Sequence, residues 1–84
     1  MNQIEIYSKD WCPYSIRAKA LLNSKQLEYN EIDVTTDYQR ELEMINRTGH
    51  FTVPQIFIDG VLVGGYDDIA ALEASGELDR RLQS

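Results

Sequence analysis

A single cysteine, followed directly by proline, lies between a segment with the pattern of a strand and one with the pattern of a helix. Gln3–Tyr7 alternates polar and apolar residues, several of them β-branched or aromatic, which predicts a strand. Pro13 suits the first turn of a helix, where its missing N–H needs no partner, and we expect that helix to run to about Lys25. Cys12 would then lie at the amino end of a helix, where free backbone N–H groups favour negative charge.

The residues after Cys12 predict a strand–helix–strand unit. Glu28–Val34 alternates again and predicts a second strand, which should run parallel to the first through a right-handed crossover. The inward face of the intervening helix is expected to be its apolar stripe, made of Ile16, Ala20, Leu21 and Leu27.

A second helix is expected over about Tyr38–Thr48. Thr36 or Asp37 can cap its amino end, because both are residue types whose side chains accept from free N–H groups. Leu42 and Ile45 are expected to face inwards.

The remaining third of the chain predicts a hairpin and a third helix. Asp59-Gly60 between the apolar runs Gln55–Ile58 and Val61–Val63 is a strong signal for two antiparallel strands. A helix over Ile69–Ser75 and a final turn or short helix over Glu77–Leu82 follow. The order βαβαββα predicts an α/β fold with a mixed four-stranded sheet flanked by helices, in one domain spanning residues 1–84.

Composition narrows the function classes. The net charge of −6, from 14 acidic and 8 basic residues, argues against nucleic-acid binding. One cysteine cannot form an internal disulfide, and a lone cysteine without a signal-peptide pattern indicates a reducing compartment, so we expect a cytoplasmic protein. No apolar run approaches the roughly 20 residues of a membrane span. No His/Cys cluster has metal spacing, so no metal is expected, and His50 is assigned a surface or loop role.

Cys12 admits two interpretations, a buried structural cysteine or a reactive thiol. The neighbours favour the second, because the helix terminus and the charge of Lys9 should both lower the pKa of the thiol. Ser15 follows one helical turn later and could donate a hydrogen bond to the sulfur. It cannot resolve a disulfide on Cys12, so a two-thiol cycle is closed to this chain.

Two later segments could belong to the same site. Thr52-Val53-Pro54 precedes a predicted strand, and from these residues alone the Val53–Pro54 bond is expected to be trans. Gly64–Asp68 is a glycine-rich turn that opens a helix, which could bind an anion or be an ordinary capped turn. Composition alone favours the ordinary turn.

Taken together, four segments closely resemble a small glutaredoxin of the bacterial type, over essentially the whole chain. They are Ile4–Tyr7, Cys12-Pro13-Tyr14-Ser15, Thr52–Ile58 and Gly64–Asp68. The resemblance implies a thioredoxin-like fold and a glutathione-dependent thiol–disulfide oxidoreductase.

The resemblance also implies residue roles. Cys12 would be the nucleophile, and Pro54 would follow a cis bond and face the thiol. Glutathione, the expected cofactor and reductant, would be bound by Lys9, Tyr14, Thr52, Val53, Gly65, Asp67 and Asp68, in addition to Cys12 and Pro54. Lys9 would face its glycyl carboxylate, which the family often contacts with a polar or basic residue on the second helix. Glu41 occupies that place here, with Arg40 beside it.

Ser15 departs from the family motif, which usually carries a second cysteine at this position. The chain is therefore either a natural monothiol member or one in which that cysteine was replaced, and the Pro13-Tyr14 pair favours replacement. Reduction of glutathione mixed disulfides through Cys12, by a monomer acting on glutathionylated thiols or proteins, is the expected activity. The alternatives are a dimer that shares an iron–sulfur cluster through Cys12 and glutathione, and a non-catalytic glutathione-binding module.

Overall fold

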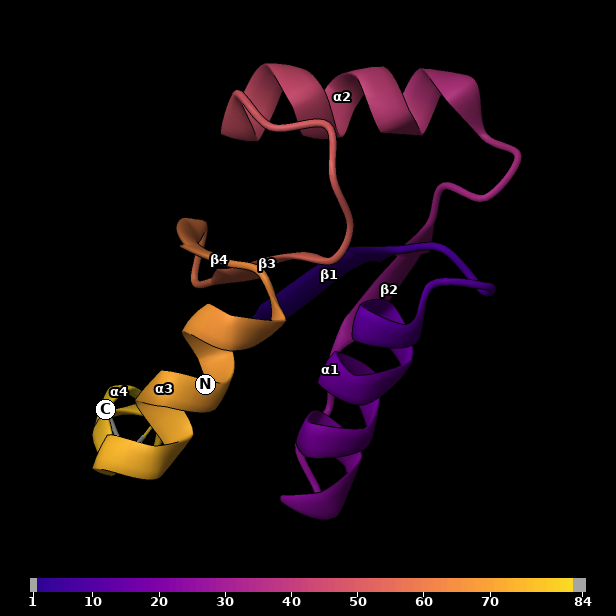
Figure 1. Cartoon of the computed structure of the whole chain (residues 1–84). Helices are drawn as coiled ribbons and strands as arrows, with labels where there is room; N and C mark the ends of the chain where they lie inside the picture. The colour runs from indigo at the N-terminus through magenta and orange to yellow at the C-terminus, as the bar shows by residue number, and fades with distance from the viewer. Residues whose placement is uncertain (1, 83–84) are drawn as a thin grey trace.

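The computed structural model describes residues 2–82 as a mixed sheet covered by helices on both faces (Figure 1). The predicted single domain over residues 1–84 also includes Met1, Gln83 and Ser84, which lie outside the described residues. The elements in chain order are β1 (Ile4–Ser8), α1 (Pro13–Ser24), β2 (Asn30–Asp33), α2 (Tyr38–Thr48), β3 (Gln55–Ile58), β4 (Val61–Gly64), α3 (Tyr66–Ser75) and α4 (Glu77–Arg81).

The sheet has the order β2-β1-β3-β4 and confirms the predicted mixed topology. β1 pairs with β2 in parallel, while β3 is antiparallel to both β1 and β4. Asp59 and Gly60 form the predicted tight turn between β3 and β4, both with positive φ, 52° and 80°. Such a turn matches the twist of the strands that it joins. The strand ends lie within two residues of those predicted.

Strand alternation divides the core into two layers. Ile4 and Ile6 of β1, with Ile56 and Ile58 of β3, pack against α1, α3 and α4. The alternate residues, among them Tyr7 and Phe57, face α2 on the other side of the sheet. Figure 1 shows this division, with α2 on one face of the sheet and α1 and α3 on the other.

The buried face of α1 corrects part of the expected stripe. Ile16 and Ala20 are exposed, whereas Ser15, Ala18 and Leu22 are buried. The inward positions still follow helical spacing, but the stripe contains a polar residue and a small one, so hydropathy alone did not reveal it. Leu21 and Leu27 do pack against the core, as predicted.

On α2, Met44 replaces Leu42 as the inward residue. Leu42 is 40 % exposed, Met44 is fully buried, and Ile45 packs partly against the core as predicted. Residues two apart lie on nearly opposite sides of a helix, so Met44 and Leu42 could not both face the sheet.

Polar contacts also fix α2 on the sheet. The buried Tyr7 hydroxyl donates to Glu43 and accepts from Arg47, at 3.0 Å. The guanidinium of Arg47 stacks over the Phe57 ring, 3.8 Å from its centroid. These contacts join the second half of α2 to both β1 and β3.

Side-chain capping sets the starts of α2 and α3. Asp37, not Thr36, caps α2 by accepting from the Arg40 N–H at 3.1 Å. The Asp68 carboxylate accepts from the Gly65 N–H at 2.9 Å, so α3 begins three residues before the predicted Ile69. Asp68 therefore lies in the first turn of α3, where its charge also suits the helix dipole.

Gly64→Ala should destabilise the fold. Gly64 has φ +124°, and an added Cβ would lie against the Asp68 carboxylate, 2.8 Å from its Cγ. We expect a loss of about 1–3 kcal/mol in the free energy of unfolding, measured by urea titration. Gly65→Ala is the matched control, since its Cβ would meet only the Pro54 carbonyl oxygen, at 3.5 Å. Equal losses in the two variants would contradict the assignment of strain to Gly64.

Candidate active site

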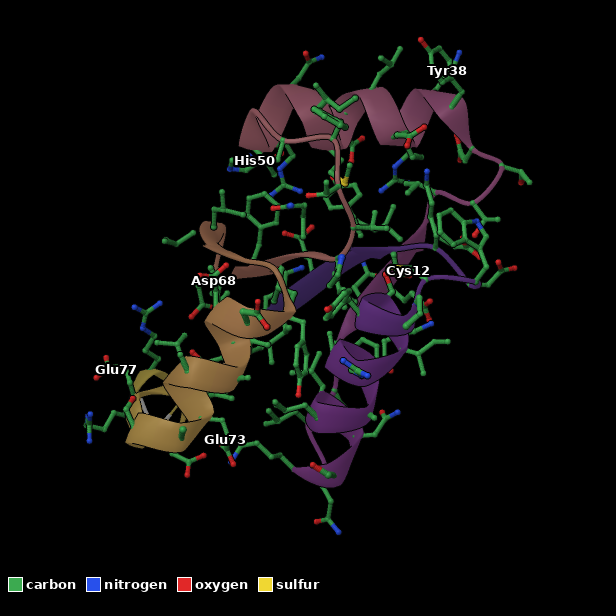
Figure 2. All side chains as sticks on the ribbon, in the orientation of Figure 1. Cys12, Tyr38, His50, Asp68, Glu73 and Glu77 are labelled. Carbon is green, nitrogen blue, oxygen red and sulfur yellow. The ribbon has the colours of Figure 1, made fainter. Side chains whose placement is uncertain are left out.

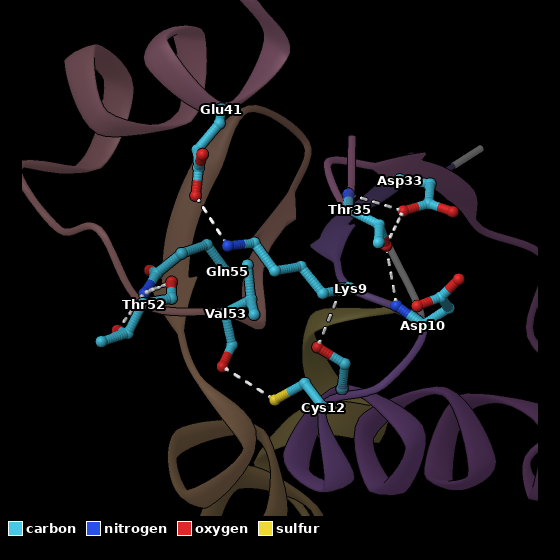
Figure 3. A network of polar contacts seen from close by, with 10 residues as sticks. Lys9, Asp10, Cys12, Asp33, Thr35, Glu41, Thr52, Val53 and Gln55 are labelled. Carbon is cyan, nitrogen blue, oxygen red and sulfur yellow. Dashed lines mark hydrogen bonds and ion pairs between the residues drawn. The ribbon is translucent and has the colours of Figure 1, made fainter. Parts of the chain in front are cut away.

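Cys12 is the N-cap residue of α1 and is 8 % exposed. Its thiol donates to the carbonyl oxygen of Val53, with Sγ and O 3.6 Å apart. This contact joins two segments that lie 41 residues apart in the sequence, the loop before α1 and the loop before β3 (Figure 3).

The environment of Cys12 favours the thiolate. Burial acts to raise the pKa of the thiol, but hydrogen bonds from the backbone and hydroxyl of Ser15 and from the Tyr14 N–H outweigh it. The positive charge of Lys9 acts in the same direction as these hydrogen bonds, and the net pKa lies below the ordinary cysteine value. The structure thus supports the reactive interpretation of this buried cysteine over the purely structural one.

Ser15 is fully buried beneath the loop that carries Cys12. Its Oγ accepts from the Lys9 N–H, with the heavy atoms 3.4 Å apart, which leaves the hydroxyl proton for the sulfur. Ser15 therefore links the end of β1 to the thiol.

Beside Cys12 is an open cavity of about 450 Å³. It is formed by the loop before β3, the turn into α3 and the first turn of α1. In Figure 2, Cys12 and Asp68 mark the starts of α1 and α3, and His50 lies on the loop above them. The lining residues are Tyr14, His50, Thr52, Val53, Pro54, Gln55, Gly64, Gly65, Tyr66, Asp67 and Asp68.

Most of the candidate ligand-binding residues line this one cavity. Tyr14 faces Tyr66, with ring centroids 6.2 Å apart. The Val53–Pro54 bond is cis, as the family resemblance implied, and the expectation of a trans bond from local sequence was wrong. The neighbouring residues carry no signal for this isomer, because X–Pro bonds in folded proteins are mostly trans.

Lys9 does not line the cavity. Its ammonium forms an ion pair with Glu41 of α2, with Nζ and Oε2 2.9 Å apart. It also lies 5.5 Å from the centroid of the Trp11 ring, which is 65 % exposed. The cation predicted to face a ligand carboxylate is thus paired with a carboxylate of the protein.

Four residues of the cavity wall were not among the predicted binding residues, namely His50, Gln55, Gly64 and Tyr66. Gln55 is 4 % exposed, and its Nε2 donates to the Thr52 carbonyl oxygen at 3.0 Å. Its Oε1 is buried and has no hydrogen-bond partner among the described residues. The sequence did contain a signal for Gln55, which is a polar residue at the start of an otherwise apolar strand. A buried amide normally has hydrogen-bond partners, so an amide at such a position indicates a polar contact nearby.

Residues 2–82 contain no group of three or more His, Cys, Asp and Glu side chains arranged to hold a metal ion. None of their helices is long and apolar enough to cross a membrane.

The fold and the site together define a thioredoxin-like protein with a cysteine of lowered pKa at a helix start, facing a cis-proline loop. A model of the Glutaredoxin family matches residues 4–63. Glutaredoxin 3 of Escherichia coli is 49 % identical over 83 residues, which cover 99 % of this chain and 100 % of the relative. The chain therefore belongs to the glutaredoxin family.

Solved structures agree with this assignment. The solution structure of glutaredoxin from Brucella melitensis has a TM-score of 0.81 and 50 % identity, covering 93 % of this chain and 85 % of that one. A buckwheat glutaredoxin–glutathione complex has a TM-score of 0.87 and 28 % identity, covering 96 % and 76 %.

Ser15→Ala should raise the pKa of Cys12. The hydroxyl stabilises the charged form, so its loss favours the neutral thiol and lowers the thiolate fraction at neutral pH. The rate of iodoacetamide alkylation against pH should show a midpoint higher than that of the unsubstituted protein. Ser24→Ala, at the far end of α1, is the control and should leave the midpoint unchanged. A midpoint that stays or falls in Ser15→Ala would contradict this role.

Proposed function

We propose that this glutaredoxin reduces glutathione mixed disulfides by a monothiol mechanism centred on Cys12. The observation that carries the proposal is a thiol of lowered pKa in contact with Val53, which lines a cavity of about 450 Å³. The Cys12 thiolate attacks the glutathione sulfur of a mixed disulfide. The Cys12–glutathione bond forms as the mixed disulfide breaks, and the other thiol leaves as a thiolate that takes up a proton.

A second glutathione thiolate completes the cycle. It attacks the glutathione sulfur of the Cys12 adduct, releasing oxidised glutathione and restoring the Cys12 thiolate. The interactions that lower the pKa of Cys12 also make it a good leaving group in this step. Ser15 cannot attack the adduct, so the two-thiol route to protein disulfides is closed.

The cavity offers groups suited to glutathione. The backbone of Thr52 and Val53 can pair with the cysteinyl residue of the tripeptide as an added strand. The first-turn N–H groups of α3, at Asp67 and Asp68, suit the γ-glutamyl carboxylate, and the Asp68 carboxylate suits the amine. That the related buckwheat glutaredoxin was solved as a glutathione complex supports this assignment.

We place this activity in a cytoplasmic monomer acting on glutathionylated thiols and proteins. The lone cysteine suits a reducing compartment, and the charge of −6 disfavours nucleic acid as a partner.

Cys12→Ser should abolish deglutathionylation of a small mixed disulfide, because no other thiol can replace Cys12. Turnover can be followed by coupling the release of oxidised glutathione to glutathione reductase and NADPH. Intact mass after incubation with oxidised glutathione should show one adduct on the unsubstituted protein and none on the variant. Turnover retained by Cys12→Ser would refute the mechanism.

Ser15→Cys should add the reduction of protein disulfides. A thiol one turn along α1 could attack the mixed disulfide between Cys12 and a protein substrate. We expect at least a tenfold gain against a disulfide-bonded protein, measured from the appearance of substrate thiols with glutathione and glutathione reductase present. Ser24→Cys adds a thiol away from Cys12 and should give no gain. Equal rates before and after Ser15→Cys would show that position 15 is not limiting.

A further inference from the structure

The ion pair between Lys9 and Glu41 stands beside the reactive thiol. Lys9 follows β1 and extends past Cys12 and Val53 to α2 (Figure 3). Both side chains are largely buried, with 20 % and 22 % exposed, so water screens the pair less than it would at the surface.

The rest of α2 holds Glu41 in this position. The Tyr7–Glu43–Arg47 contacts fix the second half of the helix to the sheet. Arg40, the residue beside Glu41, pairs with Glu43 along the helix, with Nε and Oε1 3.3 Å apart. The position of α2 therefore presents a carboxylate, and not the neighbouring guanidinium, to Lys9.

A carboxylate arriving at Lys9 meets two costs. It must displace Glu41 from the ammonium or share the ammonium with Glu41, and in either case it lies close to the negative charge of Glu41. A neutral group at the same place meets neither cost. Selectivity is the difference between the affinities for two ligands. A fixed negative charge weakens binding of the anionic ligand, and so lowers the preference for it even where the neutral ligand gains no contact.

We propose that Glu41 is a specificity-determining residue. It makes the site tolerant of mixed disulfides in which the glutathione moiety carries a neutral group in place of its glycyl carboxylate. Such substrates include glutathione esterified or amidated at its glycine, or extended there by a peptide bond. The inference rests on the proposed binding of glutathione with its glycyl end towards Lys9. Glu41 acts through Lys9 on ligand affinity and takes no part in the sulfur chemistry.

The test compares two mixed disulfides of 2-mercaptoethanol, one with glutathione and one with its glycyl monoethyl ester. Single-turnover formation of the Cys12 adduct, followed by quenched flow and intact mass, needs no second glutathione. Rates over a range of substrate concentration separate apparent affinity from the maximal rate. The ratio of the acid to the ester rate constant cancels any change in the reactivity of Cys12, because that change affects both substrates equally.

The unsubstituted protein should treat acid and ester within about twofold of each other. Glu41→Gln should raise the acid-to-ester ratio about fivefold through the apparent affinity, an effect of the size expected for one partly exposed ion pair. Glu28→Gln is the matched control, since it removes the same charge near the opposite end of β1 and should leave the ratio unchanged. In a Lys9→Gln background most of the gain from Glu41→Gln should disappear.

A strong preference of the unsubstituted protein for the acid would overturn the inference. So would an unchanged ratio in Glu41→Gln, or a full gain in the Lys9→Gln background. Failure of the proposed function looks different, because no Cys12 adduct would then form with either substrate.

Discussion

The negative charge that Cys12 can carry at the start of α1 is the constraint on which the rest of the site depends. A cysteine that is only 8 % exposed would ordinarily remain a neutral thiol. Here the sulfur lies close to three hydrogen-bond donors. Two are the N–H groups of Tyr14 and Ser15, which are free because they lie at the start of a helix, and the third is the Ser15 hydroxyl. Pro13, which has no N–H, occupies the first helical position, where the N–H would have no partner within the helix.

Strand alternation connects this thiol to the two layers of the fold. Ile4 and Ile6 of β1 pack on the side that carries α1 and α3, so the same packing that builds this core also positions the starts of both helices. Tyr7 points to the other side and anchors α2 through Glu43 and Arg47. Lys9 reaches the same helix at Glu41. A change in the seating of α2 would therefore alter the charge next to Cys12 without altering the helix that carries it.

The sequence predicted those features that local chemistry determines. Alternation gave the strands, Asp59-Gly60 gave the hairpin, and Cys12-Pro13 gave the helix start. It did not predict the face of α1, because the buried Ser15 contacts the active-site loop, and hydropathy scores a serine as exposed. The prediction that Leu42 faces inwards was wrong for a related reason. The contacts of α2 with the sheet are partly polar, and Met44 is its fully buried residue, so apolar spacing alone did not identify the inward face.

For the site, the motifs identified most of the cavity wall, yet two features depended on parts of the chain that are distant in sequence. The cis bond before Pro54 is favoured by no neighbouring residue, and only the resemblance to a family implied it. The partner of Lys9 lies 32 residues away on α2. From the local sequence, a lysine near a cysteine predicted only that its charge stabilises the thiolate. The positive charge of Lys9 therefore interacts with both Glu41 and Cys12. The ammonium still favours the Cys12 thiolate, but it is not a vacant binding point for a ligand carboxylate. In the proposed function, reactivity at the sulfur and recognition of the tripeptide's glycyl end are therefore separable.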